Sequence, residues 1–166
     1  MTNEPRIEER AAQPYAGIRR RVAMDGIGGA VDEALPELFG WLAARGVSPA
    51  GAPFIRYRVI DMAGELDIEL AVPAEVTAGD GRVEAGVLPA GRYAVLRHTG
   101  HYDGLIASNA ALLRWADEQG IALDSWETAE GTAWRARVEH YLTNPAEEAD
   151  PAQWETDVAF LTAAIP

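Results

Sequence analysis

The 166-residue sequence contains no cysteine and no lysine. Without cysteine there can be no disulfide, thiol nucleophile or zinc–cysteine site. Without lysine, Schiff-base catalysis and a phosphate-binding loop with its lysine are excluded as well. All fourteen basic residues are therefore arginine. The fold must be stabilised by its hydrophobic core.

Positive charge is also scarce, with 26 acidic residues and a net charge of −12. This balance opposes the field that gathers phosphates, so we expect no nucleic-acid partner. The acidity either favours cationic ligands or only keeps the protein soluble. No apolar run approaches the roughly 20 residues that span a bilayer, and residues 1–10 lack the apolar core of a signal peptide. We expect a cytoplasmic protein without a membrane partner, and the oligomeric state stays open.

The first half of the chain, about residues 5–75, has the pattern of a strand, a helix and two strands. The helix is indicated by apolar residues that recur at steps of three and four, and Gly46 is suited to end it. Pro36 either kinks this helix or starts its second segment. The predicted strands are 15–22, 54–61 and 66–72, and the predicted helix is 27–44.

The second half, about residues 82–163, follows after a connection at 76–81 that has no periodicity. A helix is predicted over 104–119, where Gly120 ends the apolar pattern. The predicted strands are 83–88, 92–98, 134–142 and 155–161, and the last two are joined by an acidic loop over 144–154.

Short spellings recur after both predicted helices. WLAARG at 41–46 matches WADEQG at 115–120, and GAPF at 51–54 matches GTAW at 131–134. The recurrence indicates an internal duplication. We therefore expect a single α+β domain over 1–166, with duplicated strand-helix-strand-strand units and an antiparallel sheet. A ligand groove is expected at the pseudo-two-fold seam, since such seams commonly hold pockets.

Alternation along 134–142 divides the side chains of that segment between two faces. Arg135, Arg137, Glu139 and Tyr141 share one face, whereas the mostly apolar remainder belongs to the core. Glu139 beside Tyr141 would suit a ligand cation. Alternatively, Glu139 pairs with an arginine on a solvated sheet face.

Further candidates are aromatic, and each has a structural alternative. Tyr57 and Trp134 belong to a ligand site or to the core, as does Tyr93. Tyr102 either reaches the groove or belongs to a helix start with Asp103. We expect no metal and no cofactor, because no carboxylate completes a ligand set around the histidines.

The order of several short motifs carries a resemblance that covers nearly the whole chain. They are GAPFIRY at 51–57, DIELAVP at 67–73, LPAGRY at 88–93, HTGHYD at 98–103, EHYLTNP at 139–145, and Trp154. Their order and spacing resemble the GyrI-like domain family, which also provides the effector-binding domain of some AraC-type and MerR-type regulators. A DNA-binding module would need about a hundred further residues, so a stand-alone copy is expected.

The resemblance implies a site for an amphipathic or cationic aromatic small molecule, in an aromatic cleft around a carboxylate. Glu139 matches that carboxylate within the pattern Glu-x-Tyr-x-x-x-Pro. Together with the aromatic candidates above, the expected ligand-binding residues are Glu139, Tyr57, Tyr93, Tyr102, Trp134 and Tyr141. One branch of the family hydrolyses cyclopropane-bearing natural products, and there Glu139, Tyr102 and Tyr141 would be catalytic. A third alternative is a protein-interaction role of the gyrase-inhibitor type, through the acidic loop.

Overall fold

The computed structural model describes residues 3–61 and 63–163, and it has the α+β architecture that the sequence predicts. The helices are α1 (Ile27–Ala44) and α2 (Leu105–Glu118), with short 3₁₀ turns at Met24–Gly26, Tyr102–Gly104 and Pro151–Gln153. The strands are β1 (Arg6–Arg10), β2 (Gln13–Val22), β3 (Phe54–Ile60), β4 (Leu66–Pro73), β5 (Val83–Leu88), β6 (Gly91–Thr99), β7 (Ser125–Thr128), β8 (Gly131–Trp134), β9 (Arg137–Tyr141) and β10 (Glu155–Leu161).

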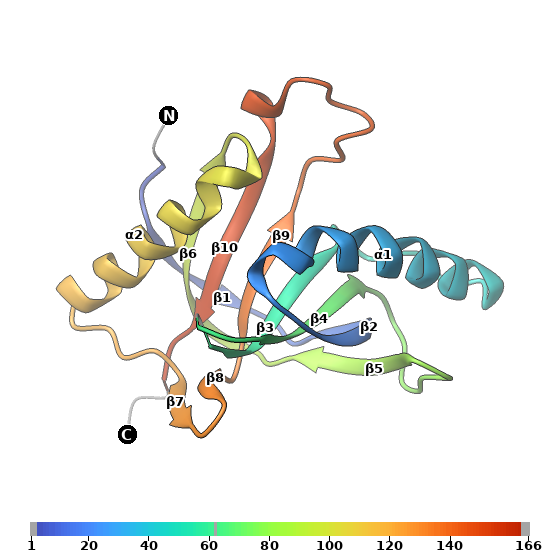
Figure 1. Cartoon of the computed structure of the whole chain (residues 1–166), viewed down its shortest axis with the longest axis horizontal. Helices are drawn as coiled ribbons and strands as arrows, with labels where there is room; N and C mark the ends of the chain where they lie inside the picture. The colour runs from blue at the N-terminus through green and yellow to red at the C-terminus, as the bar shows by residue number, and fades with distance from the viewer. Residues whose placement is uncertain (1–2, 62, 164–166) are drawn as a thin grey trace.

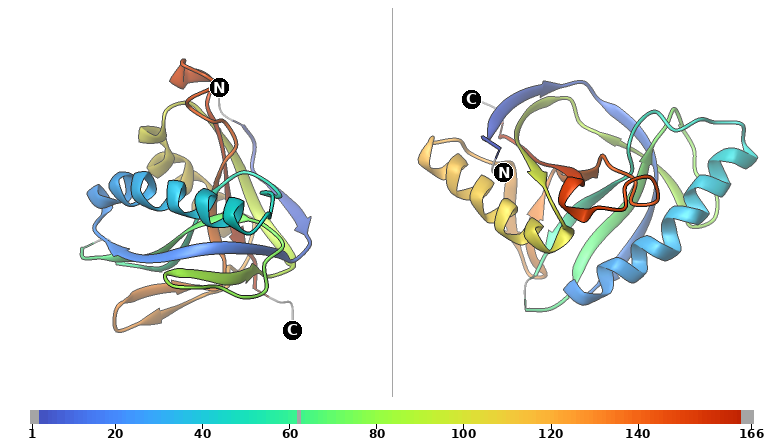
Figure 2. Two further views of the ribbon diagram at one scale, coloured as in Figure 1. Left: turned by 90° about the vertical axis from the view of Figure 1, so that its right-hand side faces the viewer. Right: turned by 90° about the horizontal axis from the view of Figure 1, so that it is seen from above.

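The strands form one curled antiparallel sheet in the order β1-β6-β10-β9-β3-β4-β2-β5, and the β7–β8 hairpin is attached to β3 (Figure 1). The two halves are related about the β3–β9 pair. The first strand of each half pairs with a strand of the other half: β1 pairs with β6, and β5 pairs with β2. Both helices lie on the same side of the curled sheet, and the connection from β9 to β10 rises between them (Figure 2). The duplicated arrangement predicted from the sequence is therefore confirmed.

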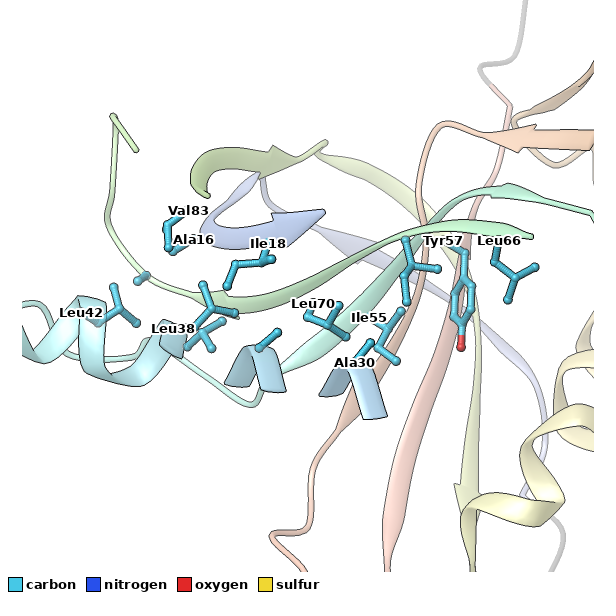
Figure 3. Packing of buried hydrophobic residues seen from close by; sticks show 14 residues of the cluster. Ala16, Ile18, Ala30, Leu38, Leu42, Ile55, Tyr57, Leu66, Leu70 and Val83 are labelled. Carbon is cyan, nitrogen blue, oxygen red and sulfur yellow. The ribbon is translucent and has the colours of Figure 1, made fainter. Parts of the chain in front are cut away.

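Each helix covers its own half of the sheet. Leu38 and Leu42 of α1 pack on Ile18 and Leu70 (Figure 3). Leu112 of α2 packs in a second cluster with Leu96, Val158 and Phe160. Burying one such leucine contributes about 1.5–3 kcal/mol. A separate cluster on the opposite face of the sheet is formed by Tyr15, Phe54, Ala71, Leu88, Tyr93, Val95, Ala136, Val138, Ala159 and Leu161. The strands are thus covered on both faces where the halves meet.

Pro36 lies inside α1, which continues through it without interruption. Proline removes the hydrogen bond to the carbonyl four residues earlier, here that of Asp32. Both residues are exposed, so water can hydrogen-bond to that carbonyl. The cost of the proline is therefore limited by its position on the outer face.

The prediction of one strand over 134–142 is wrong. β8 ends at Trp134, a bend follows at residues 135 and 136, and β9 begins only at Arg137. The amide of Arg135 donates to the carbonyl of Asp124, which ties the bend to the start of the β7–β8 hairpin. Because of the bend, the ring of Trp134 lies under the guanidinium of Arg137 rather than on the opposite face.

Two strands, β1 and β7, have no counterpart among the predicted strands. The first is the charged segment RIEER and the second is SWET, and both lie at the periphery of the sheet. Neither helix in the described residues is long and apolar enough to cross a membrane.

Candidate ligand-binding site

Glu139 occupies the seam between the two halves, in a row of side chains that runs across five strands. Residues paired in register share a face, and this row reads Leu70, Ile55, Glu139, Val158 and Leu96. Glu139 is therefore the one charged member of an otherwise apolar row, on the face that carries both helices. Glu139 is only 5% exposed. A charge buried to this degree is costly unless hydrogen bonds satisfy it.

Three uncharged groups donate hydrogen bonds to the carboxylate of Glu139. The hydroxyls of Tyr57 and Tyr141 both donate to Oε1 at 2.8 Å, and the side-chain amide of Asn109 donates to Oε2 at 2.9 Å. Among the described residues, no arginine or histidine nitrogen lies within 4.0 Å of it. The alternative of an arginine pair on a solvated sheet face is therefore wrong for Glu139.

The two tyrosine hydroxyls remain protonated at neutral pH. Burial raises the pKa of Tyr57 and of Tyr141 well above the usual value, and the negative charge of Glu139 raises both further. Figure 3 shows Tyr57 next to Leu66 near one end of the row of core side chains between α1 and the sheet, with its hydroxyl turned away from the ribbon of the sheet. Both hydroxyls can therefore act as stable donors to an anionic group.

Arg137 lies in the same strand as Glu139, two residues before it. The side chain of Asn109 lies between the guanidinium of Arg137 and the carboxylate of Glu139. One NH2 group of Arg137 donates to Oδ1 of Asn109 at 3.1 Å, while the guanidinium lies 4.6 Å from the ring centroid of Trp134 and 4.4 Å from that of Phe160. Burial lowers the pKa of Arg137 to about 10, so the group remains charged at neutral pH. Asn109 thus bridges a partly buried cation and a buried anion.

Four rings pack against one another and reach the carboxylate through the Tyr141 hydroxyl; they are named here the ring cluster and are His101, Tyr102, Tyr141 and Trp154. The Tyr102 ring lies 5.5 Å from that of Tyr141 and 4.9 Å from that of Trp154, and the His101 and Trp154 rings are stacked at 5.6 Å. Burial raises the pKa of Tyr102.

The ring cluster is positioned by the turn before α2 and by the loop before β10. Nδ1 of His101 accepts a hydrogen bond from the amide of Asp103, which caps the 3₁₀ turn that carries Tyr102. Gly100 precedes this turn with φ +133°, a conformation that favours glycine. The indole of Trp154 donates to the carbonyl of Glu148 at 2.8 Å.

The structure brings four of the six predicted ligand-binding residues together: Glu139, Tyr57, Tyr102 and Tyr141. Trp134 borders the group through Arg137. Tyr93 lies in the cluster on the opposite face of the sheet, where its hydroxyl donates to the carbonyl of Pro89 at 2.7 Å. Tyr93 therefore does not share a site with Glu139.

Asn109, Arg137 and Trp154 belong to this group but are not among the predicted site residues. Asn109 had a usable signal, because it lies four residues after Leu105 and three before Leu112, both of which are buried. A polar residue on the apolar face of a helix indicates a buried hydrogen-bonding role.

Two surface depressions lie away from Glu139. One, of about 480 Å³, is formed by the turn and strand over residues 77–85, and the other, of about 250 Å³, lies beside Arg56 and Arg58. Within the described ranges, no group of three or more histidine, aspartate or glutamate side chains is placed to hold a metal ion.

The curled sheet with two helices over one face, and a hydrogen-bonded carboxylate at its seam, define an α+β domain with a buried polar site between two similar halves. The family model of the GyrI-like small molecule binding domain matches residues 3–161. The chain therefore belongs to the GyrI-like family. Among curated proteins, no sequence matches it.

Solved structures with the same fold include the regulator EcmrR. Its complex with DNA aligns with a TM-score of 0.78 at 17% identity over 98% of this chain, which spans 58% of the EcmrR chain. The C-terminal domain of EcmrR alone aligns with a TM-score of 0.75 at 18% identity, covering 99% of this chain and 100% of that domain.

Two further structures align at lower similarity. A hydrolase from Listeria innocua has a TM-score of 0.64 at 14% identity, covering 97% of this chain and 92% of its own. SAV2435 bound to tetraphenylphosphonium has a TM-score of 0.62 at 11% identity, covering 97% and 94%. At these identities the likeness concerns the fold alone.

Proposed function

We propose that this domain binds amphipathic, cationic aromatic molecules next to Glu139, for sensing or sequestration. The observation that carries the proposal is a buried carboxylate whose three hydrogen-bond donors are all uncharged. Its negative charge lacks a direct ionic partner in the described part of the chain. At an effective dielectric constant of about 20, a cation about 4 Å away would gain on the order of 4 kcal/mol of Coulomb energy before desolvation is subtracted.

The ring cluster supplies the second requirement, which is aromatic surface for a cation and its apolar groups. Aromatic faces attract cations by about 0.5–2 kcal/mol each. Since Glu139 is 5% exposed, a ligand would reach the carboxylate by separating Tyr102 and Trp154 from Tyr141. The rings of the ligand would then replace the contacts that the ring cluster makes with itself.

Arg137 opposes this binding and tunes it. Its positive charge offsets part of the field of Glu139, but Asn109 and the two rings beneath it keep the guanidinium from a direct pair. The relatives support the same ligand class, because tetraphenylphosphonium is a cation with four aromatic rings.

A thermal-shift titration with tetraphenylphosphonium tests the proposal. At a hundred times the dissociation constant, a ligand stabilises the folded state by about 2.7 kcal/mol, which raises the melting temperature of a chain of this size by about 5–10 °C. Glu139→Gln should remove most of this shift, whereas Glu84→Gln, which removes an exposed charge elsewhere, should retain it. Equal shifts in all three proteins, or none in any, would reject a cation site at Glu139.

A second candidate function is hydrolysis of a strained cyclopropane. It is favoured by the Tyr141 hydroxyl 2.8 Å from Glu139, with the Tyr102 ring beside it. Glu139 would take a proton from water, which adds across the ring bond that breaks, while a tyrosine hydroxyl donates to the carbonyl conjugated with that ring. Incubation with a cyclopropane-bearing alkylating compound and mass detection of the water adduct tests this. Turnover by Glu139→Gln at the wild-type rate would end the hypothesis.

A further inference from the structure

A depression of about 250 Å³, named here the arginine depression, lies where β2, β3 and the β7–β8 hairpin meet. Its lining includes four arginines, Arg19, Arg56, Arg58 and Arg135, together with Trp126. Arg19, Glu69 and Arg56 are paired in register across three strands, in a row that alternates with the row of Ile55 and Glu139. The row of Arg19 and Arg56 therefore lies on the opposite face of the sheet from the row of Glu139, and Trp134, which borders the Glu139 site, lines one edge of the depression.

Three of these arginines are already paired with carboxylates. Arg19 makes a two-point contact with Asp67 at 2.9 and 2.6 Å, Arg58 lies 2.5 Å from Glu69, and Arg135 lies 2.8 Å from Asp124. Arg56 is the exception. Four guanidinium groups thus meet three carboxylates, which leaves one positive charge without a direct ionic partner.

Arg56 is only 6% exposed, and all its hydrogen bonds go to uncharged oxygens. It donates to the Tyr15 hydroxyl at 2.9 Å and to the carbonyls of Arg135 and Val87 at 2.6 and 3.3 Å. Its Nε has no hydrogen-bond acceptor, and within residues 3–61 and 63–163 no carboxylate oxygen lies within 4.0 Å of it. A buried, unpaired guanidinium creates a local positive potential that an anion in the depression would neutralise.

Trp126 gives the depression an apolar side. Trp126 is 48% exposed, which is unusual for a tryptophan. The Arg135 guanidinium lies 5.9 Å from the centroid of the Trp126 ring. An aromatic ring beside a guanidinium suits a ligand that is both planar and anionic. Sites for drug-sized ligands occupy about 300–1,000 Å³, so this depression suits a compound with one ring.

We propose that the arginine depression binds a small aromatic carboxylate, with its ring against Trp126 and its carboxylate toward Arg56, Arg58 and Arg135. The site differs from the Glu139 site in the sign of its charge, in the class of its ligand, and in the face of the sheet on which Arg19 and Arg56 lie. Although the protein has a net charge of −12, four of its fourteen arginines line the arginine depression.

The test is an NMR titration of the full chain with benzoate at constant ionic strength, with benzamide as the neutral analogue. The indole resonance that disappears in Trp126→Phe identifies the reporter. We expect benzoate to shift this resonance saturably and to bind at least tenfold more tightly than benzamide. Arg135→Gln and Trp126→Ala change exposed side chains, so the fold should persist, and each should weaken benzoate binding at least tenfold.

Two controls separate this site from general electrostatics and from the Glu139 site. Arg92→Gln removes an equally exposed charge that pairs with Glu9 outside the depression, and Glu139→Gln alters only the other face. Both should bind benzoate as the wild type does. The proposal is overturned if benzoate does not saturate, if benzamide binds equally, or if Arg92→Gln weakens binding as much as Arg135→Gln.

Discussion

Tyr57→Phe tests whether the hydrogen bonds to Glu139 hold the seam between the halves. The substitution removes one hydroxyl that donates to Oε1 at 2.8 Å and leaves the ring in the core. A hydrogen bond to a charged group contributes about 1.5–3 kcal/mol. For a chain of this size the loss should lower the melting temperature by about 3–10 °C. Urea denaturation should give the same free-energy difference with an unchanged slope.

The matched control is Tyr93→Phe. It removes a hydroxyl from a second buried tyrosine, whose partner is the uncharged carbonyl of Pro89, so it should cost only about 0.5–1.5 kcal/mol. In a double-mutant cycle, the cost of Tyr57→Phe should fall by at least about 1 kcal/mol in the Glu139→Gln background. The reasoning is refuted if Tyr57→Phe costs no more than Tyr93→Phe, or if the cycle shows no coupling.

Three further predictions follow from the same structure. Burial lowers the pKa of His140 from 6.5 to about 4, so its stabilising contribution is complete above pH 6.5 and is lost as the pH falls toward 4; His140→Phe should remove up to about 3 kcal/mol of this acid sensitivity in denaturation curves. Asn109→Ala should let Arg137 pair directly with Glu139 and weaken tetraphenylphosphonium binding about tenfold by calorimetry, whereas an unchanged affinity would contradict the bridging role. Gly86→Ala should cost about 1–3 kcal/mol, because its Cβ would lie 2.6 Å from the Tyr15 hydroxyl. Gly40→Ala, whose Cβ would meet open space, should stabilise α1 by about 0.5–1 kcal/mol. Thermal melts in which both substitutions shift the melting temperature in the same direction would refute the comparison.

The helices and most strands follow from local patterns, because their apolar periodicity is uninterrupted. The predicted bounds of α1, β5 and β10 are those of the structure. The break between β8 and β9 was not predictable in this way, since it depends on pairing with β7 and β3. β1 is similarly invisible locally, because its charged segment is held by β6, more than eighty residues away in sequence.

The site was predictable in part for the same reason. Alternation and the family motif both indicated Glu139 with Tyr141, and the β3–β9 pairing brings Tyr57 to them. The bridge from Arg137 through Asn109 requires the packing of α2 against β9, which no local pattern specifies. Ala94 and Leu96 of β6 face α2. Because side chains alternate along the strand, Tyr93 points to the other face and lies in the opposite core.

The most direct test of a cation site at Glu139 is the ratio of two affinities. Calorimetric titration would compare 1-methyl-4-phenylpyridinium with uncharged 4-phenylpyridine at mildly alkaline pH, so that the two ligands share their rings but differ in charge. The wild type should prefer the cation by about tenfold to a hundredfold, which corresponds to about 1.4–2.8 kcal/mol of charge interaction. In Glu139→Gln this preference should fall to about one. A preference that is the same in both proteins, or a wild type that favours the uncharged ligand, would contradict the account.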